Sequence, residues 1–147
     1  MKTNVFYTSS SEETKKIAAD LASSFKGGEV ILAYGDMGAG KTAFCQGLGI
    51  GLGVKGIVNS PTFNLIKVYN GTKFNLYHVD CYRLENVDEE RKDLGLSEII
   101  GDEKNITYIE WPIYASNDIL TYHPIIEVHI EYIDEEKRKI TIKDERQ

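Results

Sequence analysis

The stretch VILAYGDMGAGKT, residues 30–42, joins a short apolar run to a glycine-rich segment. The run at residues 30–34 lies between glycines and is typical of a strand buried on both faces. Residues 35–42 fit G-x-x-x-x-G-K-[ST] at every fixed position, and a helix is expected at about residues 41–52. A buried strand, a glycine loop and a helix in this order predict a loop that surrounds a phosphate group.

Each residue type in this loop has a physical reason to be there. Glycines let an anion approach the backbone N–H groups, which side chains would block. Lys41 adds a point charge for the β- and γ-phosphates, and the Thr42 hydroxyl is a suitable ligand for Mg²⁺. The helix after the loop directs the positive end of its dipole at the same phosphates. The sequence therefore predicts a bound nucleotide and Mg²⁺ at this loop.

Helical and strand patterns alternate along the rest of the chain. Residues 10–25 combine an N-terminal serine cap signal with helical apolar spacing, which predicts an amphipathic helix. Residues 63–69 and 73–80 flank the Asn-Gly dipeptide at residues 70–71, which suits the positive φ angles of a type I′ turn. We therefore expect an antiparallel hairpin in this region.

Further segments complete the expected sheet. Residues 88–100 predict one or two short helices interrupted at Gly95, and residues 106–109 predict a short apolar strand. Residues 126–133 alternate apolar and polar side chains and lead through a charged turn into residues 140–142, which predicts a terminal hairpin with one solvated face. The expected fold class is α/β: a P-loop NTPase-like mixed sheet flanked by helices, with antiparallel hairpins.

Length and composition favour a single domain over residues 1–147. The chain has 17 basic and 23 acidic residues, a net charge of −6, and an acidic chain is a poor stand-alone binder of nucleic acid. Its longest apolar run is far shorter than a membrane span, and its first ten residues lack a signal-peptide core, so a cytoplasmic location is expected. Cys45 and Cys81 are too few for a disulfide framework and are expected to be free.

Two acidic residues end apolar strands and are candidates for the chemistry around a phosphate-bound metal. Asp80 follows the strand at residues 74–79, and Glu110 follows the strand at residues 106–109. A phosphate loop needs an acidic residue near the metal. One carboxylate would hold the metal shell and the other would orient or deprotonate the attacking water, and the residues alone leave the assignment open. Either could instead be a solvated carboxylate at a strand end.

Other residues have both a functional and a structural interpretation. The segment at residues 59–63 contains a proline and two hydroxyl residues, which suits a nucleotide-sensing loop or a simple turn. His78 and Tyr82 flank Asp80 at two-residue spacing, so on an extended strand all three face one side. A single His in such a strand is usually a hydrogen-bonded core residue. Trp111 suits the core and a partner surface equally.

Four sequence blocks, in this order, are similar to a known family. They are GDMGAGKT at 35–42, SPTFNLI at 60–66, YHVDCYRL at 77–84 and IEWP at 109–112. Together they resemble the bacterial tRNA threonylcarbamoyladenosine biosynthesis ATPases, the TsaE family of small P-loop proteins, over roughly residues 9–112. A lone phosphate-loop motif would indicate only that a nucleotide binds, whereas the combination of four blocks is specific to this family. From residue 113 onward the likeness is loose.

The resemblance implies roles for individual residues. Thr42 and Glu110 would hold Mg²⁺, Asp80 would be a second essential acid near the γ-phosphate, and Trp111 would lie beside the active site. Thr62 would belong to a switch-like loop. The catalytic set that the resemblance implies is Lys41, Asp80, Glu110 and Thr62. The residues assigned to ATP are Gly38, Ala39, Gly40, Lys41, Thr42 and Ala43, the last of which stands where the family often has a second Thr.

The same resemblance implies a function. Family members are weak ATPases alone and act with a two-protein complex that transfers threonylcarbamoyl to an adenosine next to the anticodon of tRNA, so tRNA would be met through partners. Without the resemblance, a small-molecule kinase is the chief alternative, although the arginines after the loop are few for a lid: Arg83, Arg91, Arg138 and Arg146. A GTPase is disfavoured because no N-K-x-D-like sequence occurs. A non-catalytic, nucleotide-gated binding module is the other alternative.

Overall fold

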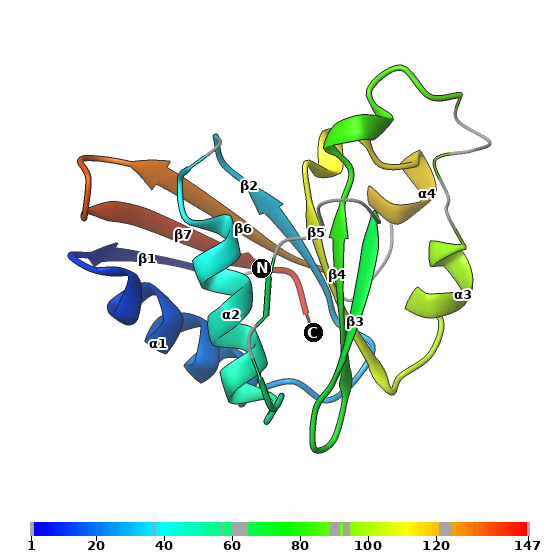
Figure 1. The fold of residues 1–147 in the computed structure, drawn as a ribbon, viewed down its shortest axis with the longest axis horizontal. Coiled ribbons are helices and arrows are strands. Elements are labelled where there is room, and N and C mark those ends of the chain that lie inside the picture. Colours follow the sequence, from blue (N-terminus) through cyan, green and yellow to red (C-terminus); the bar gives the residue numbers. More distant parts are fainter. Residues whose placement is uncertain are drawn as a thin grey trace.

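Seven strands form one mixed sheet in the computed structural model, in the order β1-β7-β6-β2-β5-β4-β3 (Figure 1). The structure describes residues 2–36, 38–56, 58–59, 65–88, 92, 95–120 and 125–146. The strands are β1 (Lys2–Thr8), β2 (Val30–Tyr34), β3 (Ile66–Asn70), β4 (Asn75–Asp80), β5 (Asn105–Glu110), β6 (Ile125–Tyr132) and β7 (Arg138–Asp144). Strands β6, β2, β5 and β4 are parallel, β7 is antiparallel to both β6 and β1, and β3 is antiparallel to β4. The expected α/β fold is therefore confirmed.

Helices cover both faces of the central strands. On one face lie α1 (Ser11–Ala22) and α2 (Lys41–Gly51), and on the other lie α3 (Leu96–Ile100), α4 (Asn117–Leu120) and the 3-10 turns η1 (Tyr82–Leu84) and η3 (Pro112–Tyr114) (Figure 1). Within β2, Ile31 and Ala33 join the core under α1 and α2, whereas Val30 and Leu32 join the core of the opposite face. Burial on both faces explains the continuous apolar run that begins the phosphate-loop stretch.

The glycines of α2 let it pack directly on α1. A Cβ atom at Gly47 would lie 2.3 Å from the carbonyl oxygen of Lys15, and one at Gly51 would lie 2.6 Å from that of Ala19. Glycine costs a helix up to about 1 kcal/mol relative to alanine, and here it permits a backbone-to-backbone approach that no larger residue allows. These two glycines therefore set how closely the second half of α2 packs on α1.

The strand β1 is not predicted by the sequence pattern. It lies at the edge of the sheet and pairs only with β7, from Lys2 opposite Asp144 to Thr8 opposite Arg138. Its side chains are mostly exposed, including Tyr7 at 70%. An edge strand with so little buried surface lacks the apolar alternation on which strand prediction depends.

The hairpin of β3 and β4 is confirmed, but its turn is not the expected type I′ turn. The last ladder pair joins Asn70 to Asn75, which leaves residues 71–74 as the loop, and neither Asn70 nor Gly71 has a positive φ. A Cβ atom at Gly71 would lie 2.5 Å from the carbonyl oxygen of Leu52, and a loop N–H donates to the same oxygen at 3.0 Å. Contact with the end of α2 therefore selects the turn geometry, which a dipeptide rule does not include.

Other expected elements are present with small shifts. The terminal hairpin is β6 and β7. Of the helices expected over residues 88–100, α3 begins after Gly95, which has φ 79°, whereas residues 89–91 and 93–94 lie outside the described residues. Both Cys45 and Cys81 are free and buried. Within the described part of the chain, no helix is both long and apolar enough to cross a membrane.

Candidate functional site

The carboxyl ends of β4 and β5 meet the first turn of α2 at one edge of the sheet. Asp80 ends β4, Glu110 ends β5, and the ladder register places them opposite each other. Both project from the face that α2 covers, because Leu76 and Tyr108, in phase with them on the same strands, pack in the core on that face. The strand-end cavity, of about 420 Å³, is lined by Gly38, Gly40, Lys41, Thr42, Asp80, Glu110 and Trp111. The structure thus brings the phosphate loop together with both candidate acids.

The loop itself has the backbone conformation that its glycines predict. Gly38 has φ 78° and Gly40 has φ 111°, in the left-handed region that favours glycine. Gly40 is the N-cap of α2 and provides no side chain to bond the first amides of the helix. The hydroxyl of Tyr108 on β5 donates to the carbonyl oxygen of Lys41 at 2.7 Å, so the helix start is attached to the sheet. Amides at such a helix start bind anions.

Lys41 is a buried cation without a hydrogen-bond partner. The residue is 5% exposed, and its Nζ atom makes no hydrogen bond to any part of the chain that the structure describes. Nζ lies 4.0 Å from the centroid of the Trp111 ring. Burial lowers the pKa of Lys41, and the nearby charges of Glu110 and Asp80 oppose that shift. An anion that entered the cavity would supply the partner that this ammonium group lacks.

The two carboxylates have different surroundings. Glu110 is 4% exposed, and its Oε2 atom is hydrogen-bonded to Nε2 of His78. Asp80 is less buried, and its Oδ1 atom accepts a hydrogen bond from the N–H of Tyr82 at 2.9 Å. Burial raises the pKa of Asp80, and the charge of Glu110 adds to the rise. Glu110 is therefore held inside the protein, whereas Asp80 faces the more open side of the cavity.

The expected common face of His78, Asp80 and Tyr82 is only partly present. His78 and Asp80 share a face of β4, but the strand ends at Asp80 and Tyr82 begins the 3-10 turn η1. The hydrogen bond from the Tyr82 N–H to the Asp80 carboxylate accompanies this change of direction. Tyr82 is 45% exposed and packs edge-on against Trp111, with ring centroids 5.0 Å apart.

Trp111 adopts a conformation that is rare for its residue type. Its φ of 56° and ψ of 51° make it the one non-glycine residue with positive φ in the described structure. Such a conformation costs on the order of 1–3 kcal/mol and clusters at functional sites. The indole is stacked on Tyr114 with centroids 6.0 Å apart and also contacts Lys41. Trp111 therefore lies at the wall of the site, between the core and the surface.

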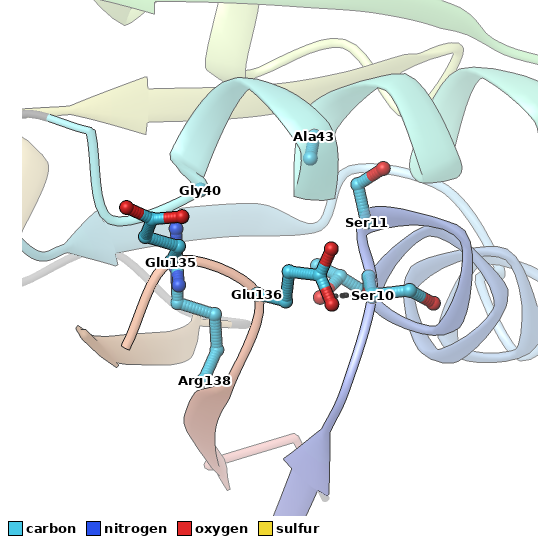
Figure 2. Close-up of a pocket in the computed structure, with 8 residues that line it drawn as sticks. Ser10, Ser11, Gly40, Ala43, Glu135, Glu136 and Arg138 are labelled. Atoms are coloured by element: carbon cyan, nitrogen blue, oxygen red, sulfur yellow. Dashed lines mark hydrogen bonds between the residues drawn. The ribbon is translucent and has the colours of Figure 1, made fainter. Parts of the chain in front are cut away.

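A second hollow adjoins the phosphate loop and is not lined by Asp80 or Glu110. This turn cavity, of about 310 Å³, is lined by Ser10, Ser11, Thr14, Gly40, Ala43, Glu135, Glu136 and Arg138 (Figure 2). Its walls come from the N-terminus of α1, the first turn of α2 and the turn between β6 and β7 (Figure 2). Gly40 lines both cavities. Ala43, assigned to ATP from the resemblance, lies in this second hollow.

Arg138 is a site residue whose sequence position suggests only a lid arginine. Its Nε atom donates to the carbonyl oxygen of Ala39 at 2.8 Å, and its Nη2 atom donates to that of Gly38 at 3.3 Å. The two bonds hold the outer side of the phosphate loop, while the N–H of Ala39 donates to the carbonyl oxygen of Asp36 at 3.0 Å. Nothing in the sequence spacing indicates this contact, because it joins residues about one hundred positions apart.

The oxygen donors in the strand-end cavity suit Mg²⁺. Thr42, Asp80 and Glu110 carry hard oxygen ligands. The described residues contain no group of three or more His, Cys, Asp or Glu that could hold a metal by itself. Mg²⁺ is commonly bound by one or two carboxylates, waters and substrate phosphates, so the donor set fits a cation that arrives with a nucleotide. Thr62, the remaining residue of the expected catalytic set, lies outside the described residues, as does the whole segment 60–64.

Comparisons with known proteins agree on one family. The family model described as threonylcarbamoyl adenosine biosynthesis protein TsaE matches residues 8–140. The chain is 46% identical over 111 residues to the tRNA threonylcarbamoyladenosine biosynthesis protein TsaE of Bacillus subtilis (strain 168), covering 76% of this chain and 68% of the relative. It is 39% identical over 137 residues to the protein of the same name from Rickettsia bellii, covering 92% of each chain.

A solved structure agrees with the sequence relatives. The crystal structure of Bacillus subtilis YdiB superimposes with a TM-score of 0.75 at 33% sequence identity, covering 97% of this chain and 86% of that chain. The match extends over both the phosphate-loop half and the C-terminal hairpin, because it spans nearly the whole chain. The family model likewise continues past residue 113, where the sequence likeness is loose, up to residue 140. On the strength of both matches, this chain belongs to the threonylcarbamoyl adenosine biosynthesis protein TsaE family.

Proposed function

We propose that the chain is a Mg²⁺-dependent ATPase that acts in the biosynthesis of threonylcarbamoyladenosine on tRNA. The observation that carries the proposal is the buried, unpartnered ammonium group of Lys41 beside Asp80 and Glu110 at the N-terminus of α2. An ammonium group and helix-start amides bind phosphate, and the carboxylates supply the acidic groups that phosphoryl transfer to water requires. Membership of the TsaE family supports the tRNA-modification pathway.

The two cavities share Gly40, and this arrangement supports one orientation of ATP along the loop. In phosphate loops of this pattern the lysine reaches the β- and γ-phosphates, so the γ-phosphate belongs in the strand-end cavity with Lys41 and the acids. The nucleoside then lies in the turn cavity beyond Ala43, where the side chains of Ser11 and Glu136 offer polar groups (Figure 2). This orientation places every candidate acid at the end of ATP where hydrolysis occurs.

Hydrolysis transfers the γ-phosphoryl group to water. The water oxygen bonds to phosphorus as the bond to the β,γ-bridging oxygen breaks, and that electron pair stays with ADP. Lys41 and the loop N–H groups stabilise the charge that develops on the phosphoryl oxygens. Asp80, the more open carboxylate, orients the water and takes up its proton. Thr42 and Glu110 would hold Mg²⁺, which would neutralise negative charge on the phosphate oxygens when bound.

We also propose that the partner is a two-protein threonylcarbamoyl-transferase complex and that the chain meets tRNA through it, in the cytoplasm. The net charge of −6 supports indirect contact with tRNA, because direct binding depends on basic residues. A kinase has less support, because two of the arginines available for a lid are already hydrogen-bonded or ion-paired within the fold. Arg138 bonds loop carbonyls, and Arg146 pairs with Asp144 at 2.6 Å.

The test is multiple-turnover formation of threonylcarbamoyladenosine on tRNA, with a threonylcarbamoyl donor, the two partner proteins and ATP, with and without this chain. We expect sustained product only with the wild type and loss with Lys41→Ala. Equal product in all three mixtures would contradict the proposal. Glu110→Gln separates an ATPase from a nucleotide-gated binding module, because it keeps the shape of the site but weakens the metal ligand. Product formation by Glu110→Gln at the wild-type rate, without phosphate release, would favour the module.

A further inference from the structure

His78 is a buried ionisable residue to which the proposed mechanism gives no role. It lies on β4 between Leu76 and Asp80, opposite Tyr108 of β5, and is fully buried at 0% exposure. Its ring meets that of Tyr108 edge-on, with centroids 5.5 Å apart and planes at 72°. Tyr108 in turn holds the first residue of α2 through its hydroxyl. His78 therefore lies in the layer directly beneath the strand-end cavity.

The one hydrogen bond that the structure gives to the His78 ring is made to a site residue. Nε2 contacts Oε2 of Glu110, whereas Nδ1 is buried and has no partner among the described residues. When Glu110 is ionised, as a metal ligand is, its carboxylate only accepts hydrogen bonds, so the contact then requires the ring form that carries a proton on Nε2. This ring form makes the hydrogen bond to Glu110 and leaves the buried Nδ1 atom without a hydrogen-bond partner among the described residues.

This contact limits how Glu110 presents its two oxygens. Glu110 has three rotatable side-chain bonds, and a glutamate at a cavity wall has several rotamers available to it. Because His78 binds Oε2, Oε1 is the carboxylate oxygen that remains for a ligand in the cavity that Glu110 lines. The partner is rigid: the imidazole is enclosed by the core and its backbone belongs to the strand next to that of Glu110.

We infer that His78 is a positioning residue that holds Glu110 so that one carboxylate oxygen faces the divalent cation brought by the nucleotide. The inference rests on the proposed function, because it takes Glu110 as a ligand of that cation. Partners of metal ligands fix ligand orientation, and their removal typically costs about 10- to 100-fold in metal affinity. His78 should therefore govern the affinity for the cation and leave the binding of the nucleotide itself to Lys41 and the loop amides.

Two amide substitutions give a matched test, because they differ in where they place an N–H group. The amide nitrogen of Gln reaches the position of Nε2, whereas that of Asn corresponds to Nδ1, which faces no acceptor. We would titrate Mg²⁺ into the full chain saturated with ADP and measure heats of binding. ADP binding in EDTA and thermal unfolding serve as controls for the loop and for the fold.

We expect His78→Asn to need about 10-fold or more Mg²⁺ for half-saturation, with ADP binding in EDTA unchanged. For His78→Gln, we expect the Mg²⁺ concentration for half-saturation to stay within about threefold of the wild-type value. Mg²⁺ affinities of both variants equal to the wild type, or equally weakened, would overturn the inference. A wild type that binds ADP without any response to Mg²⁺ would instead refute the proposed metal site, which distinguishes the two failures.

A measurement on the unmodified chain keeps the inference testable if His78→Asn does not fold. Nitrogen-15 NMR of the histidine side chains reports which ring nitrogen carries the proton. We expect His78 to be protonated on Nε2 and to show a coupling across the hydrogen bond to Glu110. In Glu110→Gln, we expect that coupling to be lost or the chemical shift of Nε2 to change. A neutral ring protonated on Nδ1 alone would overturn the inference, because Nε2 would then have no proton to donate to Glu110.

Discussion

The two cavities on either side of Gly40 are built in different ways. The strand-end cavity is lined by charged groups that are largely buried, with Lys41 at 5% and Glu110 at 4% exposure. The turn cavity is bordered by the exposed turn residues Glu135 and Glu136 and by the N-terminus of α1. Charge interactions are strong where water is excluded and weak where it is not. Substitutions in the strand-end cavity should therefore have large effects on nucleotide binding and hydrolysis, and substitutions in the turn cavity should have smaller ones.

Removing Lys41 should have the largest effect. Lys41→Ala deletes the one buried ammonium group beside the loop, and we expect ADP affinity to fall by at least about 100-fold, as for loss of one partner of a buried charge pair. Isothermal titration measures the change, and the exposed Lys55 provides the control variant Lys55→Ala. Retained affinity in Lys41→Ala would place the phosphates elsewhere and remove the contrast between the cavities.

Arg138 borders the turn cavity but acts on the loop, so it should have the next largest effect. We expect Arg138→Ala to weaken binding of inorganic tripolyphosphate by about 10-fold, since two charge-assisted hydrogen bonds to the loop are lost. Tripolyphosphate has no nucleoside, so the change reports loop geometry alone. Arg138→Lys should be intermediate, because a single ammonium group does not reproduce the planar fork of donors.

The control for Arg138 is its exposed neighbour, in the variant Lys137→Ala, which changes charge by the same amount. If Arg138→Ala weakened ADP but left tripolyphosphate binding unchanged, Arg138 would act on the nucleoside and not on the loop. The turn cavity would then be the more selective of the two, opposite to the expectation from burial.

Ser10 tests the outer wall of the turn cavity, where a smaller effect is expected. Its Oγ atom accepts a hydrogen bond from the N–H of Glu13 at 3.2 Å and so caps α1. Ser10→Ala should lower the free energy of unfolding by about 1 kcal/mol, measured by urea denaturation, with ADP affinity within about twofold of the wild type. Ser9→Ala is the matched control. A large loss of affinity without loss of stability would show a direct nucleotide contact.

Asp80 should show the smallest change, in the pH dependence of stability. Burial raises its folded pKa above the unfolded value, so the ionised form disfavours the folded state at neutral pH. Asp80→Asn should therefore raise the thermal midpoint at pH 7, and the gain should disappear as the pH falls through the raised folded pKa to below the unfolded pKa of about 3.9. The exposed Asp20 provides the control Asp20→Asn. A midpoint lowered at pH 7 would contradict this sign.

Local patterns predicted much of the fold. The stretch at residues 30–42 forms the expected strand, loop and helix start, because glycine φ angles and continuous apolar character are properties of neighbouring residues. The strand ends at Asp80 and Glu110 were also located from short apolar runs. The prediction of a type I′ turn was wrong because Gly71 packs against Leu52. Strand β1 was not predicted because it is held in the sheet by its pairing with β7.

The sequence by itself determined the phosphate loop, the candidate acids at the strand ends and the resemblance to the TsaE family. Only the tertiary structure decided which groups meet: Asp80 opposite Glu110, Lys41 on the ring of Trp111, and Arg138 on the loop. The bond from His78 to Glu110 joins residues 32 positions apart, and that from Arg138 to Ala39 joins residues 99 positions apart. Such contacts depend on the order and register of strands in the sheet, which no local spacing encodes.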